Sequence, residues 1–337
     1  MNTREEAEKF IQLAKEVPIL DVRSPGEYQK GHIPGAISFP LFNNQERAEI
    51  GTIYKQVGQA VAVERGMELV QPKIQEIFNT GNAYAKNGKL LVHCWRGGKR
   101  SEAVAGLLGS SGTDVRILNG GYKAYRNWVL AQFEKPYQLS IVGGGTGSGK
   151  TKILHALERA NEQILDLEGL ADHRGSAFGR LGAKEDVTFT QFENRIADKL
   201  FFNKSSHFWV EDESRTLGKL YIPAQFWEQM RAAKVFHIEL PDAARMEILL
   251  EDYGHFPASE LEDSIRKLGR RLGGLRMQQA VDALSKGDLK QVIRILLPYY
   301  DKAYSHSIHP RSPENIQQIP FDSFDADAIA RELIALR

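Results

Sequence analysis

The chain has 337 residues, a net charge of +1 and one cysteine. Its length suits two domains of about 150 residues each better than one core. No apolar run approaches the ~20 residues that span a bilayer, and a single cysteine excludes an intramolecular disulfide framework and a multi-cysteine zinc site. We therefore expect a cytoplasmic protein without a membrane partner, in which the free thiol stays reduced.

The charge is unevenly distributed along the chain. Residues 1–135 carry a net charge of +4, and the remainder carries −3. Within the acidic part, nine Lys and Arg residues against three Asp lie between Arg266 and Lys302. Such a local basic block is typical of contact with a polyanion.

Strand and helix patterns alternate in the first part of the chain. We expect strands at 18–22, 89–93 and 115–118, a turn leading into a further strand at 31–37, and helices at 67–78, 101–108 and 122–133. This alternation predicts a parallel sheet covered on both faces. We assign residues 1–133 to a first α/β domain and residues 134–138 to a linker.

The second part repeats the pattern, with strands expected at 139–142, 163–167, 208–210 and 235–240. We assign 139–258 to a second α/β domain and 259–337 to a helical, basic region packed on it. Ser259 and Glu262 have the spacing of a capping box at a helix start. The leucines and Ile265 that follow recur at helical spacing, which predicts a buried face opposite the basic one.

The single cysteine directly follows the apolar strand at 89–93. Cys94 is predicted to be a nucleophile because nearby cations and a helix N-terminus stabilise a thiolate. The backbone amides of the glycines after it can converge on an anion. The expected anion-binding loop is Trp95, Arg96, Gly97, Gly98, Lys99 and Arg100. A buried structural cysteine is the alternative on these residues alone.

A second loop matches the phosphate-binding pattern G-x4-G-K-[ST] between a strand and a helix. It comprises Gly144, Gly145, Thr146, Gly147, Ser148, Gly149, Lys150 and Thr151. Lys150 supplies a charge for a diphosphate group, and Thr151 can hold Mg²⁺. The apolar strand that ends in the acids Glu211, Asp212 and Glu213 has the pattern of a magnesium-side strand, although Arg215 nearby leaves a salt bridge as the alternative. A diphosphate is the expected ligand, and ATP is one carrier of it.

Residues 1–130 resemble rhodanese domains in four places. These are the runs 21–28, 31–36 and 119–122 and the Cys94 loop, which has five residues between Cys94 and Arg100, one more than many sulfurtransferases. The resemblance implies that Cys94 carries sulfur or selenium. Asp21 and Arg23 would then tie loops together beneath the site, His32 would be a turn or core histidine, and His93 would face away from the nucleophile.

Nearly the whole chain resembles the tRNA 2-selenouridine synthases, in the runs 94–98, 172–179, 191–194 and 211–215. The resemblance implies S-geranylation of 2-thiouridine at the wobble position of tRNA, with geranyl diphosphate as co-substrate. Selenium from selenophosphate, the second co-substrate, then replaces the geranylthio group. The implied partners are this tRNA and an enzyme that supplies selenophosphate. The choice of tRNAs and the oligomeric state stay open.

The resemblance also suggests substrate contacts. Those expected near the reacting groups are Asp172, His173, Arg174, Glu211, Asp212 and Arg215, with a loop-stabilising salt bridge as the alternative. Those expected on tRNA phosphates are Arg266, Lys267, Arg270, Arg271 and Arg276, with a solvated helix face as the alternative. Trp95 would stack on a flipped base, line an apolar geranyl pocket or only pack. The rival functions are a P-loop kinase or NTPase with a rhodanese regulatory domain, and a tRNA-binding protein of a sulfur relay.

Overall fold

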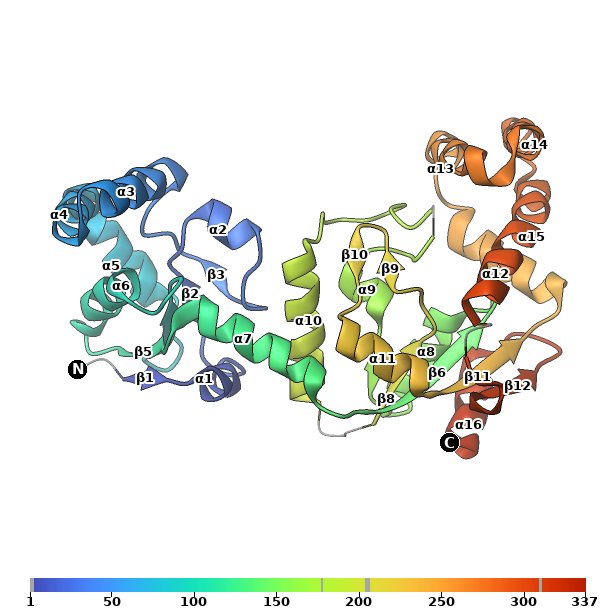
Figure 1. Ribbon diagram of the computed structural model, residues 1–337, viewed down its shortest axis with the longest axis horizontal. Coiled ribbons are helices and arrows are strands. Elements are labelled where there is room, and N and C mark those ends of the chain that lie inside the picture. The colour runs from blue at the N-terminus through green and yellow to red at the C-terminus, as the bar shows by residue number, and fades with distance from the viewer. Residues whose placement is uncertain (1–2, 177, 204–206, 309–310) are drawn as a thin grey trace. The chain divides into compact units, whose positions relative to one another are not determined.

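The computed structural model describes residues 3–176, 178–203, 207–308 and 311–337, without the side chains of 305–308. Ala177, which belongs to the run 172–179, and residues 309–310 of the C-terminal region lie outside the described residues. Two compact units are present (Figure 1): Met1–Gln132 with Glu193–Asp198, and Phe133–Phe192 with Lys199–Arg337. No described helix is long and apolar enough to cross a membrane.

The first unit is built on a five-stranded parallel sheet in the order β1–β5–β4–β2–β3, as the alternating pattern predicts. Its strands are β1 (Arg4–Glu5), β2 (Ile19–Asp21), β3 (Ile37–Ser38), β4 (Lys89–His93) and β5 (Asp114–Leu118). Its helices are α1 (Ala7–Leu13), α2 (Pro25–Gln29), α3 (Asn44–Gln56), α4 (Gln59–Val70), α5 (Ile74–Ala83), α6 (Lys99–Gly109) and α7 (Gly121–Glu134).

The central strand β4 is buried on both faces. Leu90 and Val92 belong to the core that α5 and α6 cover. His93 points to the opposite face, where its ring lies 6.5 Å from Phe10 of α1 and 6.1 Å from Tyr122 of α7. Because side chains alternate along a strand, helices on both faces fix the position of β4 and of the loop that follows it.

The single helix expected over 67–78 is wrong. α4 ends at Val70, a 3₁₀ turn covers Gln71–Lys73, and α5 begins at Ile74. Pro72 explains the break, because proline lacks the amide hydrogen that the next α-helical turn needs and its ring clashes with the preceding turn. The apolar spacing continues across the break, which is why the pattern suggests one helix.

The second unit has a five-stranded parallel sheet in the order β12–β11–β6–β8–β7, which confirms the second α/β fold. Its strands are β6 (Gln138–Gly144), β7 (Ile164–Leu165), β8 (His207–Glu211), β11 (Lys234–Glu239) and β12 (Ile316–Pro320), and β9 (Thr216–Leu217) with β10 (Leu220–Tyr221) forms an antiparallel hairpin. Its helices are α8 (Lys150–Arg159), α9 (Leu167–Ala171), α10 (Phe189–Phe202), α11 (Ala224–Ala232), α12 (Asp242–Tyr253), α13 (Ala258–Leu272), α14 (Gly274–Ser285), α15 (Leu289–Ile308) and α16 (Ala326–Leu336).

The C-terminal region is not wholly helical. Its segment β12 pairs in parallel with β11, with Ile316 opposite Val235, and forms one edge of the second sheet. The following helix α16 buries Ile329 and Leu333 in the core that α8 shares. Sequence reasoning missed this strand because five residues with two glutamines carry little apolar alternation.

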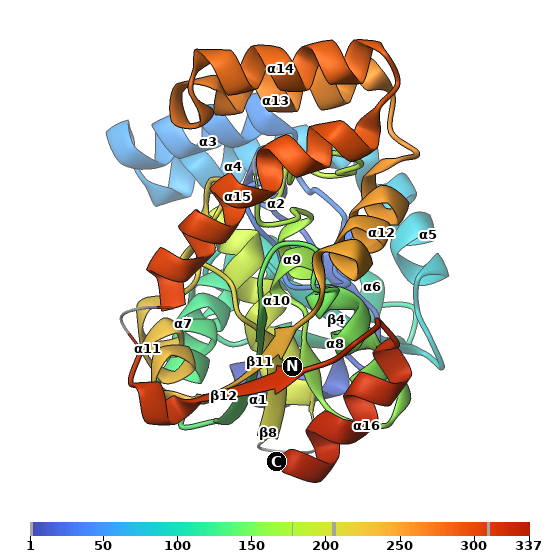
Figure 2. The same ribbon diagram turned by 90° about the vertical axis from the view of Figure 1, so that its right-hand side faces the viewer.

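The helices α13, α14 and α15 share a core of their own. Figure 2 shows α13 and α14 side by side, with α15 leading from them toward the sheet. The expected buried face of α13 is confirmed, since Leu261, Ile265 and Leu268 all lie in this core. Its basic side chains are therefore left at the surface.

The capping box expected at the start of α13 is wrong. The helix begins at Ala258, directly after Pro257, and no side chain caps it. Proline holds the backbone angle that suits the residue before a helix, so α13 starts before Ser259 can act as its cap. The Glu262 carboxylate instead accepts hydrogen bonds from Arg266, which lies one helical turn further along α13.

Candidate active site

The Cys94 loop connects β4 to α6 in the first unit. Cys94 is buried, with 4% of its surface exposed. Its Sγ lies 3.3 Å from Ser101 Oγ and 3.9 Å from the Gly98 carbonyl oxygen. Because α6 begins at Lys99, the sulfur lies beside the N-terminal turn of a helix, where the backbone dipoles favour negative charge.

Burial raises the pKa of Cys94, but the hydrogen bond from Ser101 and the positive charge of Arg100 outweigh it, with help from the backbone amides of Ser101 and Arg96, so the pKa of the thiol is lowered. A lowered pKa increases the thiolate fraction at neutral pH. The expectation of an activated nucleophile therefore has a physical basis, and Ser101 is a contributor that sequence reasoning did not single out.

The glycine turn before α7 sets the shape of the Cys94 loop. The backbone amide of Tyr122 donates to the Cys94 carbonyl at 2.9 Å, and that of Lys123 donates to the Trp95 carbonyl at 3.0 Å. A Cβ at Gly121 would lie 2.3 Å from the Gly97 nitrogen, so only glycine allows this approach. The rhodanese-like run 119–122 thus acts as a support for the loop.

The cations of this loop differ in their surroundings. Arg100 forms an ion pair with Glu27 at 2.7 Å and is mostly buried. Lys99 is exposed and lies 3.7 Å from Glu102, and Arg96 is exposed. Trp95 has 40% of its surface exposed beside the ring of Tyr122. Arg96 and Lys99 are therefore the cations of this loop that face solvent, while Arg100 lies beneath the surface.

The polar residues beneath the loop are structural, as expected. Arg23 is fully buried and donates to Asp21 at 2.6 Å and to the Gly31 carbonyl at 2.8 Å. His93 lies 3.6 Å from the same carboxylate, on the face away from Cys94. His32 stacks on Tyr28 with ring centroids 3.9 Å apart, which confirms it as a turn histidine.

The first unit also includes residues from the middle of α10, which sequence reasoning did not anticipate. Arg126 of α7 is paired with Glu193 and also donates to the side-chain oxygen of Asn194. The Asn194 amide donates to the His32 carbonyl at 2.8 Å and to Tyr122 Oη at 2.9 Å. These contacts give the family-like run 191–194 a structural role next to the support of the Cys94 loop.

The phosphate loop of the second unit connects β6 to α8, as expected. Gly147 and Gly149 adopt φ angles of +78° and +72°, which side chains other than glycine rarely adopt. The Lys150 ammonium donates to the Gly144 carbonyl at 3.0 Å. Residues from Thr146 to Thr151 line a cavity of about 1030 Å³.

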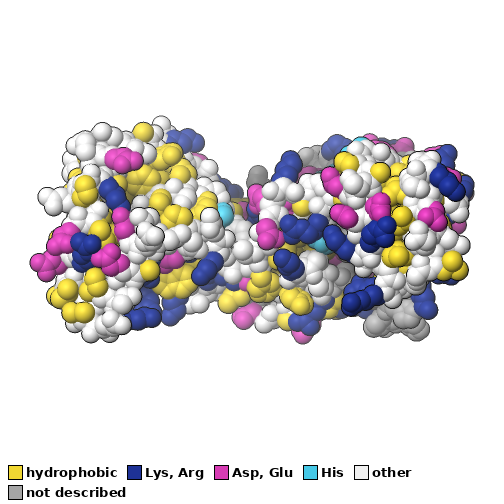
Figure 3. All heavy atoms as spheres, turned by 90° about the horizontal axis from the view of Figure 1, so that it is seen from above, with side chains coloured by type: hydrophobic (Ala, Val, Ile, Leu, Met, Phe, Trp, Pro, Cys, Tyr) yellow, Lys and Arg dark blue, Asp and Glu magenta, His cyan; other side chains and the backbone are white. Residues whose placement is uncertain are grey.

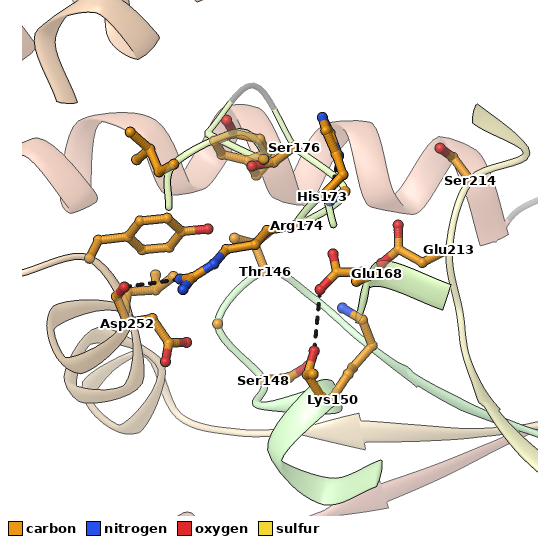
Figure 4. Close-up of a pocket in the computed structure, with 18 of the residues that line it drawn as sticks. Thr146, Ser148, Lys150, Glu168, His173, Arg174, Ser176, Glu213, Ser214 and Asp252 are labelled. Atoms are coloured by element: carbon orange, nitrogen blue, oxygen red, sulfur yellow. Dashed lines mark hydrogen bonds between the residues drawn. The ribbon is translucent and has the colours of Figure 1, made fainter. Parts of the chain in front are cut away.

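Three glutamates, Glu168, Glu211 and Glu213, lie close to this loop, and sequence reasoning did not anticipate Glu168. Figure 4 shows Lys150, Glu168 and Glu213 pointing toward one another. A Cβ at Gly175 would lie 2.5 Å from Glu168 Oε1 and 2.6 Å from Glu213 Oε2, so the two carboxylates are neighbours. The Thr151 hydroxyl donates to Glu168 at 3.3 Å. A cation and two acids thus meet at the phosphate loop.

The three glutamates hold their protons more strongly than usual. Burial, and then the Glu168 charge, raise the pKa of Glu213 to about 8, although Lys150 opposes this. Burial also raises the pKa of Glu168 against the opposing charge of Lys150, and raises that of Glu211 well above its usual value. Mutual proximity makes it unfavourable for all of them to be ionised together.

The raised pKa of Glu213 predicts a pH-dependent stability. Between about pH 4.5 and 8 the folded state holds a proton that the unfolded state has lost, so stability falls as the pH rises through this window. Glu213→Gln is therefore expected to raise the melting temperature at pH 8.5 by roughly 3–6 °C, and far less at pH 5. Thermal unfolding at both pH values checks this, with Glu332→Gln as an exposed control. An equal gain at both would contradict the assignment.

Asp212, which directly follows β8, is hydrogen-bonded to two side chains of the C-terminal region. Its Oδ1 accepts from Arg311 at 2.6 Å and its Oδ2 accepts from Tyr304 at 3.2 Å. The salt-bridge alternative therefore applies to Asp212, with Arg311 and not Arg215 as the partner. Arg215 is exposed and is not among the cavity-lining residues, and Glu211 is buried behind the cavity, where its Oε1 accepts the Glu168 amide at 2.8 Å.

Asp172, His173 and Arg174 all line the cavity. Asp172 accepts the backbone amides of Lys184 and Glu185 at 2.6 Å each, so it orders its own loop. The His173 ring fills the space beside two glycines: a Cβ at Gly179 or Gly218 would lie within 2.7 Å of it. Arg174 donates to the Asp252 carbonyl at 3.1 Å (Figure 4).

The basic residues expected to contact tRNA lie on two helices. Arg266, Lys267, Arg270 and Arg271 are exposed on α13, and Arg276 is exposed on α14. Figure 3, a view from above relative to Figure 1, shows Lys and Arg side chains at the surface of the second unit. Arg271 also lines the cavity at the phosphate loop, so part of the basic face borders this cavity.

Two family models match the chain. The model of the tRNA 2-selenouridine synthase AAA domain covers residues 137–321, and that of the rhodanese-like domain covers 3–127. A tRNA 2-selenouridine synthase from Sulfurovum sp. is 33% identical over 86% of this chain and 88% of that protein. The one from Bdellovibrio bacteriovorus is 32% identical over 88% and 90%. The N-terminal domain of an ATP/GTP binding protein from Clostridium difficile 630 is 42% identical over 38% of this chain and 99% of that chain, with a TM-score of 0.36.

The fold and the two loops define a class of proteins that join a rhodanese-like thiol loop to a P-loop unit with a helical C-terminal region. Within this class, the similarity over most of the chain places the protein: it belongs to the tRNA 2-selenouridine synthase family.

Proposed function

We propose that this protein is a cytoplasmic transferase that converts 2-thiouridine at the wobble position of tRNA into 2-selenouridine in two steps. Geranyl diphosphate first alkylates the sulfur at the phosphate loop. Selenium from selenophosphate then replaces the geranylthio group, with Cys94 in its anion-binding loop guiding the selenium. The observation that carries this proposal is the presence in one chain of an activated thiol loop and a phosphate loop that opens into a partly apolar cavity.

The cavity supports an isoprenoid diphosphate as the ligand. Leu249 of α12 touches the loop, since a Cβ at Gly147 would lie 2.8 Å from its Cγ. Further lining residues with apolar surface are Tyr253, Leu268, Tyr299 and Ala303. Groups attached to a bound diphosphate therefore meet hydrocarbon close to the loop, which suits a geranyl chain.

The alkylation step needs charge stabilisation at one end and a proton acceptor at the other. The thiouridine sulfur attacks C1 of the geranyl group, the C1–O bond breaks, and the diphosphate leaves with the electron pair. Lys150 and the loop amides would stabilise this growing negative charge. The N3 proton of the base is lost in the same conversion, and the ionised member of the pair Glu168 and Glu213 is the nearby carboxylate that could accept it.

Magnesium fits this site as a counter-ion. Among the described residues, no group of three or more His, Cys, Asp or Glu side chains could hold a metal ion. The Thr151 hydroxyl would therefore hold it together with diphosphate oxygens, which are the oxygen ligands that Mg²⁺ prefers. The ion would add positive charge on the leaving group.

The selenium step would use the Cys94 loop. Its backbone amides, with Arg96, Lys99 and Arg100, provide a site for the phosphate part of selenophosphate. Alkylation makes the sulfur a better leaving group. The selenium of selenophosphate can therefore attack C2 of the base, the C2–S bond breaks and geranylthiol leaves with a proton, and water then cleaves the Se–P bond to release phosphate. An enzyme that supplies selenophosphate would be a partner.

Ligand binding tests this function against its rivals. We expect geranyl diphosphate to bind at least about 100-fold more tightly than inorganic diphosphate in calorimetric titrations, because several buried methylene groups add affinity at ~0.8 kcal/mol each. Equal affinities would remove the isoprenoid from the proposal. Steady ATP hydrolysis would favour a P-loop kinase or NTPase, and a thiol that forms no sulfur or selenium adduct would favour a sulfur-relay tRNA-binding protein.

The exposed basic face of α13 predicts where tRNA binds. The double charge reversal Arg270→Glu with Arg271→Glu is expected to weaken tRNA binding and to reduce the slope of log K against log salt by about 2, one for each lost phosphate contact. Filter binding at a series of salt concentrations measures both quantities. Arg331→Glu on α16 is the control, and unaltered binding of the double variant at low salt would place the tRNA elsewhere.

A further inference from the structure

The phosphate loop is held by two side chains of α15, one helical turn apart. Tyr304 Oη accepts the Gly144 backbone amide at 2.7 Å. Asp301 is paired with Arg245 of α12, whose Nε donates to the Thr146 carbonyl at 2.9 Å. Gly144 and Thr146, both in the first half of the glycine-rich segment, are therefore tied to a helix that lies more than 140 residues further along the chain.

The Tyr304 hydroxyl is fixed from both sides. It accepts from Gly144 and donates to Asp212 at 3.2 Å, and the ring stacks on His237 with centroids 5.7 Å apart. Burial and the charge of Asp212 raise the pKa of Tyr304, so the hydroxyl keeps the proton that it donates. Asp212 is held in turn by the buried Arg311.

Gly144 is the residue at which this network meets the phosphate-binding lysine. Its amide is bound by Tyr304, and its carbonyl accepts the Lys150 ammonium at 3.0 Å. Its φ angle of +152°, and a built Cβ only 2.4 Å from Ser148 Oγ, restrict the position to glycine. A shift of this residue would therefore move the start of the loop and the resting place of Lys150 together.

We propose that Tyr304 is a positioning residue of the phosphate loop, which holds Gly144 through its hydroxyl and so fixes the loop in the conformation that binds a diphosphate. The nature of the group attached to the diphosphate rests on the proposed function, whereas the positioning role does not. The apolar packing of α15 also reaches the loop, because Ile293 and Leu297 pack against Leu249, and the loss of the Tyr304 hydroxyl alone leaves this packing unchanged.

The variant Tyr304→Phe tests the role because it keeps the ring and removes only the hydroxyl. The Gly144 amide and Asp212 each lose a partner, and the affinity for inorganic diphosphate, measured by calorimetry on the full-length protein, is expected to fall about 10-fold. The KM for geranyl diphosphate should rise by a similar factor with kcat nearly unchanged, a split that a general loss of stability does not produce. Tyr221→Phe, an exposed tyrosine of β10, is the control and should bind as the native protein does.

Native diphosphate affinity in a folded Tyr304→Phe protein would overturn the proposal. Should that variant be less stable, its diphosphate affinity is measured below the onset of its thermal unfolding, and an unchanged affinity there would overturn the proposal equally. Failure of the proposed function has a different signature, namely diphosphate binding that depends on Tyr304 without any geranyl transfer to tRNA.

Discussion

Replacing Cys94 with alanine is expected to abolish selenium incorporation into tRNA and to leave geranylation intact. Cys94 is the single thiol of the chain, and its pKa is lowered by Ser101 and Arg100 against the opposing effect of burial. Removing a nucleophile of this kind should cost the selenium step roughly 1,000-fold or more. Mass spectrometry of nucleosides from treated tRNA measures both products.

The variant Ser101→Ala serves as the graded control for Cys94. Loss of the Ser101 hydroxyl removes the contact at 3.3 Å to Sγ and should raise the pKa of the thiol. Selenium incorporation should then fall near neutral pH and recover as the pH is raised, whereas Cys94→Ala should not recover. Loss of geranylation in Cys94→Ala would refute the division of labour between the two loops.

Replacing Lys150 with alanine is expected to slow geranyl transfer by about 100- to 1,000-fold. The Lys150 ammonium lies at the phosphate loop beside Glu168 and Glu213, where it would contact a bound diphosphate (Figure 4). Removal of one charged group from a leaving-group site typically costs this much. Single-turnover transfer from geranyl diphosphate to 2-thiouridine tRNA measures the rate.

The Lys150→Ala variant also separates the geranylation step from the selenium step. Lys150→Ala should still convert tRNA that already carries the geranylthio group, because we assign that step to the Cys94 loop. Lys219→Ala, a surface lysine of the β9–β10 turn, should match the native protein in both assays. An unchanged geranylation rate in Lys150→Ala would remove the phosphate loop from the alkylation.

Local sequence patterns were sufficient to predict the Cys94 loop, the phosphate loop and most strands of the two parallel sheets. The run from Gly144 to Thr151 and the strand before Cys94 were predictable because the glycine spacing and the apolar run are themselves local features of the sequence. Asp21 and Arg23 were predictable as structural because they bond each other and a nearby turn. In each case the pattern and the contact lie in the same stretch of chain.

The rest of the site depends on contacts between distant segments, which leave no local pattern. Tyr304 reaches Gly144 and Arg311 reaches Asp212 across 160 and 99 positions. The middle of α10 joins the first unit through Asn194 for the same reason. The local sequence around a buried tyrosine or arginine of the C-terminal region does not indicate which distant residue it contacts.

The central claim is that one chain carries out both steps, with the geranylated base as the intermediate. The most direct test is mass spectrometry of nucleosides from 2-thiouridine tRNA incubated with the protein, with geranyl diphosphate and selenophosphate each omitted in turn. We predict 2-selenouridine with both donors, only the geranylated base without selenophosphate, and unmodified 2-thiouridine without geranyl diphosphate. Formation of 2-selenouridine in the absence of geranyl diphosphate would contradict the account.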